Sequence, residues 1–174
     1  MIFKKFLFVI GTTRELVAAL VSSINIPIHI HSHSTAGLAS LNLIAAVESG
    51  ATMIDTCNSS FSEGASHPTT ESIIVALEGM GYKTDIDVSK MDEVSQYLKE
   101  IRKKYWQFES EFTGLDPRVL VNQVPGGMIS NLSSQLKEQG ALDRMDEVLQ
   151  EIPKVREDLG FPPLVTPTSQ IVGS

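Results

Sequence analysis

Two short apolar segments that alternate with helical patterns most constrain the fold of this chain. Residues 26–31 and 52–55 have the composition of buried strands, and apolar side chains recur at helical spacing in residues 13–22, 38–47 and 68–81. Strands that alternate with helices predict parallel βαβ units. Because two parallel strands alone do not form a stable covered sheet, we expect other chains to complete the sheet, or this segment to be a piece of a larger α/β fold.

The second half of the sequence has a helical pattern instead. Apolar side chains recur there with the 3-4-3-4 spacing of an amphipathic helix, at Met91, Val94, Leu98, Ile101 and Tyr105. A turn is expected at residues 125–127, followed by one helix over residues 132–140 and another over 145–152. Pro153 is expected to end the last of these, because proline lacks the backbone N–H that a helix interior needs.

The composition excludes several classes of protein. The 174 residues carry a net charge of −7 and no basic cluster, so no nucleic-acid-binding surface is expected. The single cysteine, Cys57, excludes an intrachain disulfide and fits a reducing compartment such as the cytoplasm. Residues 1–11 lack a small-residue cleavage site, so a signal peptide is not expected. No segment approaches the roughly 20 apolar residues that cross a bilayer.

Alternating histidines follow the first predicted strand. His31 and His33 are two residues apart, so their side chains share one face of an extended chain and aim beyond the strand end. Two neutral imidazoles in that position can hold a divalent metal ion. The alternative is an exposed strand end that carries histidines by chance, because this spacing lacks a flanking third ligand. His29 lies deeper in the strand and is expected to be a hydrogen-bonded core histidine.

Two further polar residues lie beyond the second predicted strand. His67 could be a third metal ligand, but it precedes Pro68, which suits the first position of a helix, so a capping or loop role is the preferred interpretation. Asp55 could orient a ligand histidine or could simply be solvated at the strand end. Cys57 is expected to be a small buried residue without special reactivity.

Seven stretches of the sequence together resemble a known family. They are HSHSTAG at residues 31–37, IDT at 54–56, PTTE at 68–71, FESE at 108–111, QVPGGM at 123–128, SQLKEQG at 134–140 and PLVTPTSQ at 163–170. In order and spacing they resemble the carboxyltransferase domain of biotin-dependent enzymes. That family includes the oxaloacetate decarboxylase α subunit, the B subunit of two-subunit pyruvate carboxylase and the transcarboxylase core subunit.

The resemblance implies an α/β fold that is the C-terminal portion of a TIM (β/α)8 barrel, a fold that needs about 250 residues when complete. Residues 1–86 would supply the last two βα units of the barrel, and residues 87–174 a truncated, mainly helical extension. The front of the barrel would be missing, and so would the family's metal-binding aspartate and carbamylated lysine, which lie in that part. Lys4 and Lys5 cannot be assigned that lysine's role.

The resemblance also implies a reaction, in which CO2 moves between carboxybiotin and pyruvate or oxaloacetate through a metal-stabilised enolate. His31 and His33 match the family's two imidazole metal ligands. The cofactors would be a divalent metal ion, zinc by preference with manganese or cobalt as alternatives, and biotin carried on a separate domain or subunit. Thr166 matches the threonine that passes a proton between pyruvate and biotin, although spacing alone favours a turn residue.

Several partners follow from the same resemblance: a biotin carrier domain, a biotin carboxylase subunit or a sodium-pumping membrane complex, and further copies of the intact protein in a homo-oligomer. The direction of the reaction depends on those partners and stays open. Two alternatives to an active enzyme also stay open. The chain could be a catalytically inactive, truncated remnant, or a split subunit that needs another chain for the front of the barrel. Alone, it is expected to be inactive.

Overall fold

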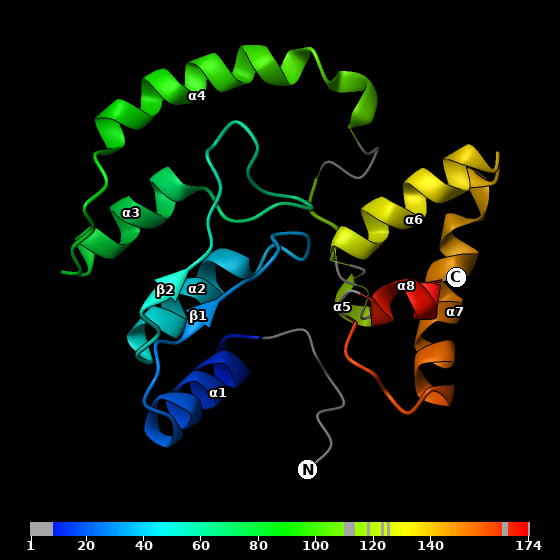
Figure 1. Cartoon of the computed structure of the whole chain (residues 1–174), viewed down its shortest axis with the longest axis horizontal. Helices are drawn as coiled ribbons and strands as arrows, with labels where there is room; N and C mark the ends of the chain where they lie inside the picture. The colour runs from blue at the N-terminus through cyan, green and yellow to red at the C-terminus, as the bar shows by residue number, and fades with distance from the viewer. Residues whose placement is uncertain are drawn as a thin grey trace.

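The computed structural model describes residues 9–109, 114–117, 119–122, 124, 126–164 and 167–173. These residues form an N-terminal α/β half and a C-terminal helical unit (Figure 1). The elements are α1 Ile10–Ser23, β1 His29–Ile30, α2 Ala39–Glu48, β2 Met53–Ile54, α3 Thr70–Gly79, α4 Val88–Lys103, α5 Val119–Asn122, α6 Gly126–Glu138, α7 Met145–Asp158 and α8 Thr168–Gly173, with 3-10 turns at η1 Trp106–Phe108 and η2 Leu142–Arg144.

The predicted βαβ unit is present. Strands β1 and β2 are parallel, with His29 opposite Met53 and Ile30 opposite Ile54, and α2 connects them. Both strands are shorter than the segments predicted from the sequence. Among the described residues each pairs only with the other, so the flanking residues lack the second neighbour that would extend the ladder.

One small apolar cluster of this half joins α1, β1 and α2, and α2 and α3 bury further apolar side chains outside it, such as Leu43 and Ile74. The buried members of the cluster are Val17, Ile28, Ala46 and Ala51. Helix α1 lies against α2 in this packing (Figure 1). Two of the four side chains are alanine methyl groups, so the apolar area that they remove from water is small.

Helix α3 begins later than the sequence predicts. The prediction placed Pro68 at its first position, but the helix starts at Thr70. The backbone amide of Cys57 donates to the Pro68 carbonyl at 2.9 Å, and the amide of Thr70 donates to the Cys57 carbonyl at 2.8 Å. This parallel bridge extends the line of β2 and holds residues 68–69 in an extended conformation.

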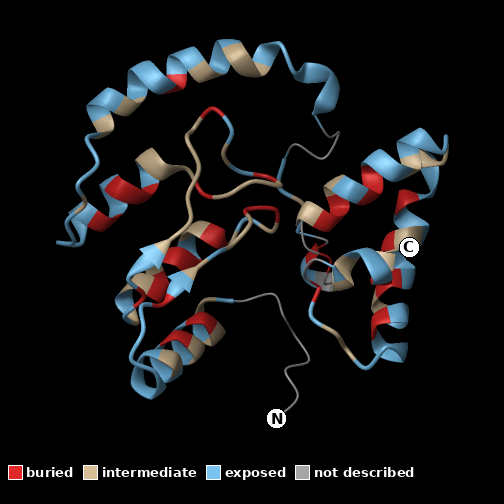
Figure 2. Cartoon of the chain, in the orientation of Figure 1, coloured by how far each residue is buried: buried red, intermediate tan, exposed pale blue. Residues whose placement is uncertain are grey.

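Helix α4 is present as predicted, but it is not buried by its apolar side chains. Val94 is 51% exposed, and the only buried residue of the helix is Ser95. The Ser95 hydroxyl donates to a Glu71 carboxylate oxygen at 2.8 Å, and its backbone carbonyl accepts from the Ser60 hydroxyl at 2.6 Å. Polar contacts of Ser95 therefore attach helix α4 to the loop after β2 and to α3. Met91, Leu98 and Ile101 of α4 are half-buried, and its outer surface is largely exposed (Figure 2).

The C-terminal helices enclose the largest apolar cluster among the described residues. Its buried members are Val119, Val124, Met128, Ile129, Leu132, Met145, Leu149, Ile152, Leu164 and Val172. Figure 2 shows these buried positions along the facing sides of α6 and α7. This unit contains a core of its own.

Two predictions for this unit were wrong. Helix α6 begins at Gly126, within the predicted turn, and α7 continues through Pro153 to Asp158. Leu149 and Ile152 before the proline and Arg156 after it are all buried on α7. Packing on both sides of Pro153 offsets the hydrogen bond that proline cannot make.

None of the helices in the described residues is long and apolar enough to cross a membrane.

Candidate metal centre

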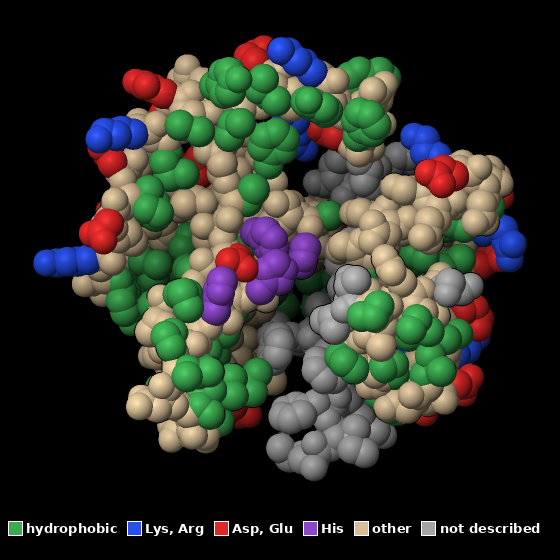
Figure 3. Space-filling model, in the orientation of Figure 1, with side chains coloured by type: hydrophobic (Ala, Val, Ile, Leu, Met, Phe, Trp, Pro, Cys, Tyr) green, Lys and Arg blue, Asp and Glu red, His purple; other side chains and the backbone are tan. Residues whose placement is uncertain are grey.

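The carboxyl end of β1 carries a cluster of imidazole rings. Strand β1 ends at Ile30, and His31 and His33 lie in the loop that follows it. The spacing predicted that the two side chains converge, and the structure places the Nε2 atoms of His31 and His33 3.3 Å apart. Figure 3 shows the histidines gathered on one face of the molecule, between the α/β half and the helical unit.

Hydrogen bonds fix which nitrogen of each ring carries the proton. The Nδ1 atom of His33 lies 2.6 Å from the Ala65 carbonyl oxygen, and Nδ1 of His31 lies 2.7 Å from Asp55 Oδ2. A carbonyl or ionised carboxylate oxygen only accepts, so both Nδ1 atoms are N–H donors. In a neutral ring the Nε2 atom then keeps its lone pair. The two lone-pair nitrogens are therefore the atoms that face each other.

Asp55 connects two histidines. Its Oδ2 accepts from His31 and its Oδ1 lies 2.7 Å from His29 Nε2. These hydrogen bonds, that of His31 first and that of His29 next, lower the pKa of Asp55 below its ordinary value of 3.8. The carboxylate is thus ionised at neutral pH and stands where an orienting residue for His31 is predicted. The side chain of His29 is 49% exposed, so the expectation of a core histidine was wrong, although its hydrogen bond is present.

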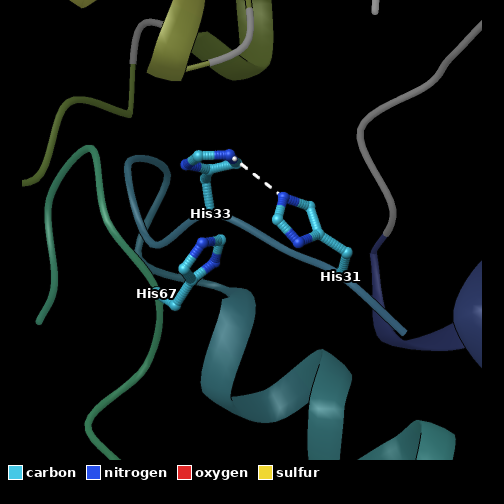
Figure 4. A group of neighbouring side chains, drawn as sticks. All are labelled: His31, His33 and His67. Atoms are coloured by element: carbon cyan, nitrogen blue, oxygen red, sulfur yellow. Dashed lines mark hydrogen bonds between the residues drawn. The ribbon is translucent and has the colours of Figure 1, made fainter. Parts of the chain in front are cut away.

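His67 joins the cluster from the loop after β2. Its ring centroid lies 4.5 Å from that of His31 and 4.6 Å from that of His33. Its Nδ1 lies 2.8 Å from the Ser32 carbonyl oxygen, so the expected loop role is present. One ring nitrogen from each of His31, His33 and His67 lies within 4.8 Å of the others (Figure 4).

Sequence reasoning gave His67 only a loop role because a lone histidine before proline is a weak signal. A stronger signal was available in the positions of these residues along the chain. His31 and His33 follow β1, and His67 follows β2. Because the carboxyl ends of parallel strands meet at one edge of a sheet, the segments after β1 and β2 are expected to lie side by side.

Burial keeps the His33 ring neutral. It lowers the pKa of His33 below 6.5, and the nearby rings of His67 and His31 lower it further, against the raising effect of the hydrogen bond to Ala65. A neutral imidazole is the form that binds metal ions.

The donor set fits a divalent transition-metal ion. The Nε2 atoms of His31 and His33 lie 3.3 Å apart, a contact that Figure 4 marks with a dashed line. Two nitrogen ligands of one tetrahedral zinc ion, with Zn–N bonds of about 2.0–2.1 Å, lie about 3.3–3.4 Å apart. Cys57 is free and partly exposed and is not a member of the cluster. Thr166, the predicted proton-transfer residue, lies outside the described residues.

The histidine loop is attached to the helical unit. The backbone amide of Asp116 donates to the Thr35 carbonyl at 2.8 Å, and Ala36 packs against the core of the helical unit. Gly37 has a φ of +76°, a backbone conformation that favours glycine, and a Cβ there would lie 3.3 Å from a Leu115 methyl group. Glycine thus allows the histidine loop to approach Leu115 closely. A Cβ on Gly127 in α6 would lie 3.9 Å from His33 Cε1. The cluster therefore lies where the two parts of the molecule meet.

Two protein-family models match the chain. The model described as "HMGL-like" matches residues 9–98, which include the histidine cluster, and the model described as "Conserved carboxylase domain" matches residues 119–174 in the helical unit.

Named proteins and solved structures are similar over most of the chain. The B subunit of pyruvate carboxylase from Methanocaldococcus jannaschii is 55% identical over 92% of this chain and 28% of its own length. The "2-oxoglutarate carboxylase large subunit" of Hydrogenobacter thermophilus is 48% identical over 85% of this chain and 23% of its own length. The carboxyl transferase domain of Rhizobium etli pyruvate carboxylase, solved with pyruvate and biocytin, has a TM-score of 0.90 at 32% identity over 96% of this chain and 28% of that one.

Proposed function

The chain belongs to the carboxyltransferase-domain family of biotin-dependent enzymes, and from that premise we propose that it forms the metal-binding, C-terminal part of such a domain. In the complete enzyme this part would help to move CO2 between a keto acid and biotin. The observation that carries the proposal is the pair of lone-pair nitrogens of His31 and His33, held 3.3 Å apart by hydrogen bonds at both Nδ1 atoms.

The role of His31 and His33 would be to hold the divalent ion. Zinc suits two imidazoles best, and manganese or cobalt would also accept them. When bound, the ion would supply Lewis-acid polarisation of the keto-acid carbonyl and stabilise enolate charge. Asp55 would keep the His31 ring in the tautomer that leaves Nε2 free, and Ala65 would do the same for His33.

Thr166 would transfer the proton between the keto acid and biotin. A hydroxyl group donates and accepts, so it can pass a proton on without holding a charge. Biotin itself would arrive on a separate carrier domain or subunit. A solved relative was determined with pyruvate and biocytin, so that protein binds both ligands.

In this proposal the relatives indicate the keto acid, and partners decide the direction of the reaction. One relative is named for pyruvate and another for 2-oxoglutarate. Pyruvate or oxaloacetate is proposed for this chain because the pyruvate carboxylase relative is the more similar of the two. A biotin carboxylase partner would drive carboxylation, and a sodium-pumping membrane complex would use decarboxylation.

A second candidate is a chain without activity of its own, either a remnant or a split subunit. The two-stranded sheet favours it, because a TIM barrel has eight strands and the described residues contain two. The relatives are also about four times as long as the matched segment. On this proposal, residues 1–86 are the last two βα units of a barrel and another polypeptide segment supplies its front.

A fusion tests the main proposal. The part of the Methanocaldococcus jannaschii relative that precedes the matched segment is joined to this chain, and carboxyl exchange between oxaloacetate and biotin is measured. We expect activity from the fusion, and none above that of free metal from the chain alone. His31→Ala should abolish both the activity and the bound metal. An inactive but folded and metal-loaded fusion would favour the remnant.

A pair of threonine variants of the fusion tests the proton transfer. Thr166→Ala should lower turnover by roughly 10²-fold, the usual cost of a lost acid–base group, with metal content unchanged. Thr168→Ala is the matched control, because the Thr168 hydroxyl donates to the Pro163 carbonyl at 2.8 Å and has no assigned role in proton transfer. Equal turnover in the two variants would assign Thr166 to the turn alone.

A further inference from the structure

The third histidine of the cluster changes what this chain can do without any other polypeptide. A metal ion held by His31 and His33 alone would be under-coordinated, because catalytic metal sites have about three protein ligands. His67 lies where the third ligand would stand. We propose that the 174-residue chain binds one divalent transition-metal ion by itself, through one ring nitrogen each of His31, His33 and His67.

The first support for His67 is the tautomer of its ring. Nδ1 of His67 lies 2.8 Å from the Ser32 carbonyl oxygen, and a carbonyl accepts only, so Nδ1 is the donor and Nε2 keeps the lone pair. The same argument applies to His33 at the Ala65 carbonyl and to His31 at Asp55. In each of the three rings Nδ1 is tied to an acceptor, so Nε2 is the nitrogen that can bind an ion, and the Nε2 atoms of His31 and His33 face each other. Metal-binding histidines are held in this way by their other ring nitrogen.

The second support is the distance between the three rings. Their ligand nitrogens lie within 4.8 Å of one another, whereas nitrogens around one tetrahedral ion lie about 3.3–3.4 Å apart. The pair His31 and His33 already has that spacing at 3.3 Å. The His67 ring is therefore close to the pair, and its nitrogen would move toward the other two when an ion binds.

The third support is that the segments carrying the rings are fixed to each other. The backbone amide of Ser34 donates to the Ser66 carbonyl at 2.8 Å, and the Thr35 hydroxyl donates to the Gly64 carbonyl at 3.0 Å. These bonds join the loop after β1, directly after His33, to the loop after β2, directly before His67. The ligands are thus largely positioned before an ion arrives, which lowers the entropic cost of binding.

The inference uses the metal site of the proposed function but does not depend on the carboxyl-transfer reaction. Its test is metal binding to the unmodified chain, with Zn²⁺ and Co²⁺ as probes. We expect one equivalent per chain by equilibrium dialysis, and visible Co²⁺ absorption of the intensity typical of four- or five-coordinate sites. Absence of stoichiometric binding would overturn the inference.

Substitutions then identify the ligands. His67→Gln should weaken Zn²⁺ binding by about 10²-fold or more, because even residues that only support a ligand cost about 10–100-fold when lost. His31→Gln and His33→Gln should have effects at least as large. His29→Gln should weaken binding less than any of the three, because His29 lies outside the cluster and reaches His31 only through Asp55. Gln150→Glu on the exposed surface of α7 is the matched control and should leave the affinity unchanged.

The pattern of lost Zn²⁺ binding among the variants distinguishes a failure of the third-ligand inference from a failure of the proposed function. If His31→Gln and His33→Gln abolish binding and His67→Gln binds as the wild type does, the third-ligand inference is wrong and the metal site of the proposed function stands. A second measurement does not depend on the variants folding. Imidazole ¹⁵N spectra of the unmodified chain should show three Nε2 resonances that shift when Zn²⁺ is added, and an unmoved His29. A His67 Nε2 resonance that stays in place would overturn the assignment.

Discussion

The helical unit and the α/β half are built on different kinds of contact. Helices α6 and α7 enclose a cluster of ten buried apolar residues with their neighbours. The corresponding cluster of α1, β1 and α2 has four buried members, two of them alanines. Outside that cluster the α/β half also buries apolar side chains of α2 and α3, among them Leu43, Ile74 and Leu77. It adds hydrogen bonds in the network around Ser95 and Glu71 and in the loops that carry the histidines.

This difference has a physical consequence for where stability and chemistry lie. Apolar burial contributes in proportion to area, whereas each hydrogen bond contributes about 1 kcal/mol net and depends on correct geometry. The helical unit is therefore expected to be the more stable part. The α/β half divides its buried apolar side chains between a small cluster and the helices α2 and α3, and it carries the histidines on loops that hydrogen bonds hold together.

The largest expected effect concerns association of the α/β half. Ile26 and Met53 are 66% and 45% exposed beside the short sheet, and exposed apolar strands invite pairing with other chains. Light scattering of the chain should show oligomers or aggregates, and Met53→Lys should reduce them. Val75→Lys on α3, where the valine is 60% exposed, is the matched control and should reduce association less. A monomeric wild-type chain with one cooperative melt would contradict the expected difference between the α/β half and the helical unit.

Cavity variants measure the two cores directly. Leu149→Ala should destabilise the helical unit by about 2–5 kcal/mol. Val17→Ala in the smaller cluster should cost about 1–2 kcal/mol, because it removes two methyl groups. Hydrogen exchange read separately for α7 and α2 reports each part. Equal losses in the two parts would remove the distinction between them.

The polar network predicts a pH dependence for the α/β half. Burial raises the pKa of Glu71, but the hydrogen bonds from Ser59 and Ser95 outweigh that effect, and the net pKa is below 4.5. A carboxyl with a lowered folded-state pKa stabilises the fold above its unfolded value, and the stabilisation is lost as the pH falls through the folded-state pKa. Glu71→Gln should cost about 1–2 kcal/mol at pH 7.

Urea unfolding of the wild type and Glu71→Gln should therefore give curves that converge as the pH falls below 4.5. Gln150→Glu on α7 is the control for a general effect of charge. The difference in its free energy of unfolding from the wild type should not disappear in the same way as the pH falls. A pH-independent gap between wild type and Glu71→Gln would contradict an ionised Glu71 in the network.

The smallest effect is expected at an exposed ion pair. Arg14 of α1 lies 2.7 Å from a Glu48 carboxylate oxygen of α2, and both side chains are more than one-third exposed. Arg14→Met should cost less than about 1 kcal/mol, and the difference should shrink as salt is added. A larger, salt-independent loss would show that the small cluster of this half depends on the ion pair.

The sequence predicted those features that rest on local periodicity. The βαβ order, helix α4 and the convergence of His31 and His33 follow from side-chain spacing along one segment. It did not predict that α4 would be held by Ser95, because a serine among apolar residues gives no periodic signal. It also missed the passage of α7 through Pro153, where burial of Leu149, Ile152 and Arg156 overrides the local preference of proline.

The candidate site was likewise predicted only in part from the sequence. His31 and His33 are neighbours in sequence, so their shared face could be deduced. His67 is 34 residues beyond His33, and only the parallel pairing of β1 with β2 brings the two loops together. The spacing within either segment does not reveal this meeting, and only the order of the two segments after parallel strands indicates it.

The position of the histidines across two loops makes metal binding a crosslink. An ion shared by the segments after β1 and β2 would close a chain segment of more than thirty residues, and a ligand that binds only the folded state stabilises it by RT ln(1 + [L]/Kd). At a free ion concentration about one hundred times Kd this linkage is worth about 2.7 kcal/mol. Such a contribution would couple folding of the α/β half to metal supply. Depletion of the ion would then loosen the two strands, whereas the helical unit, which has a core of its own, would not lose this contribution.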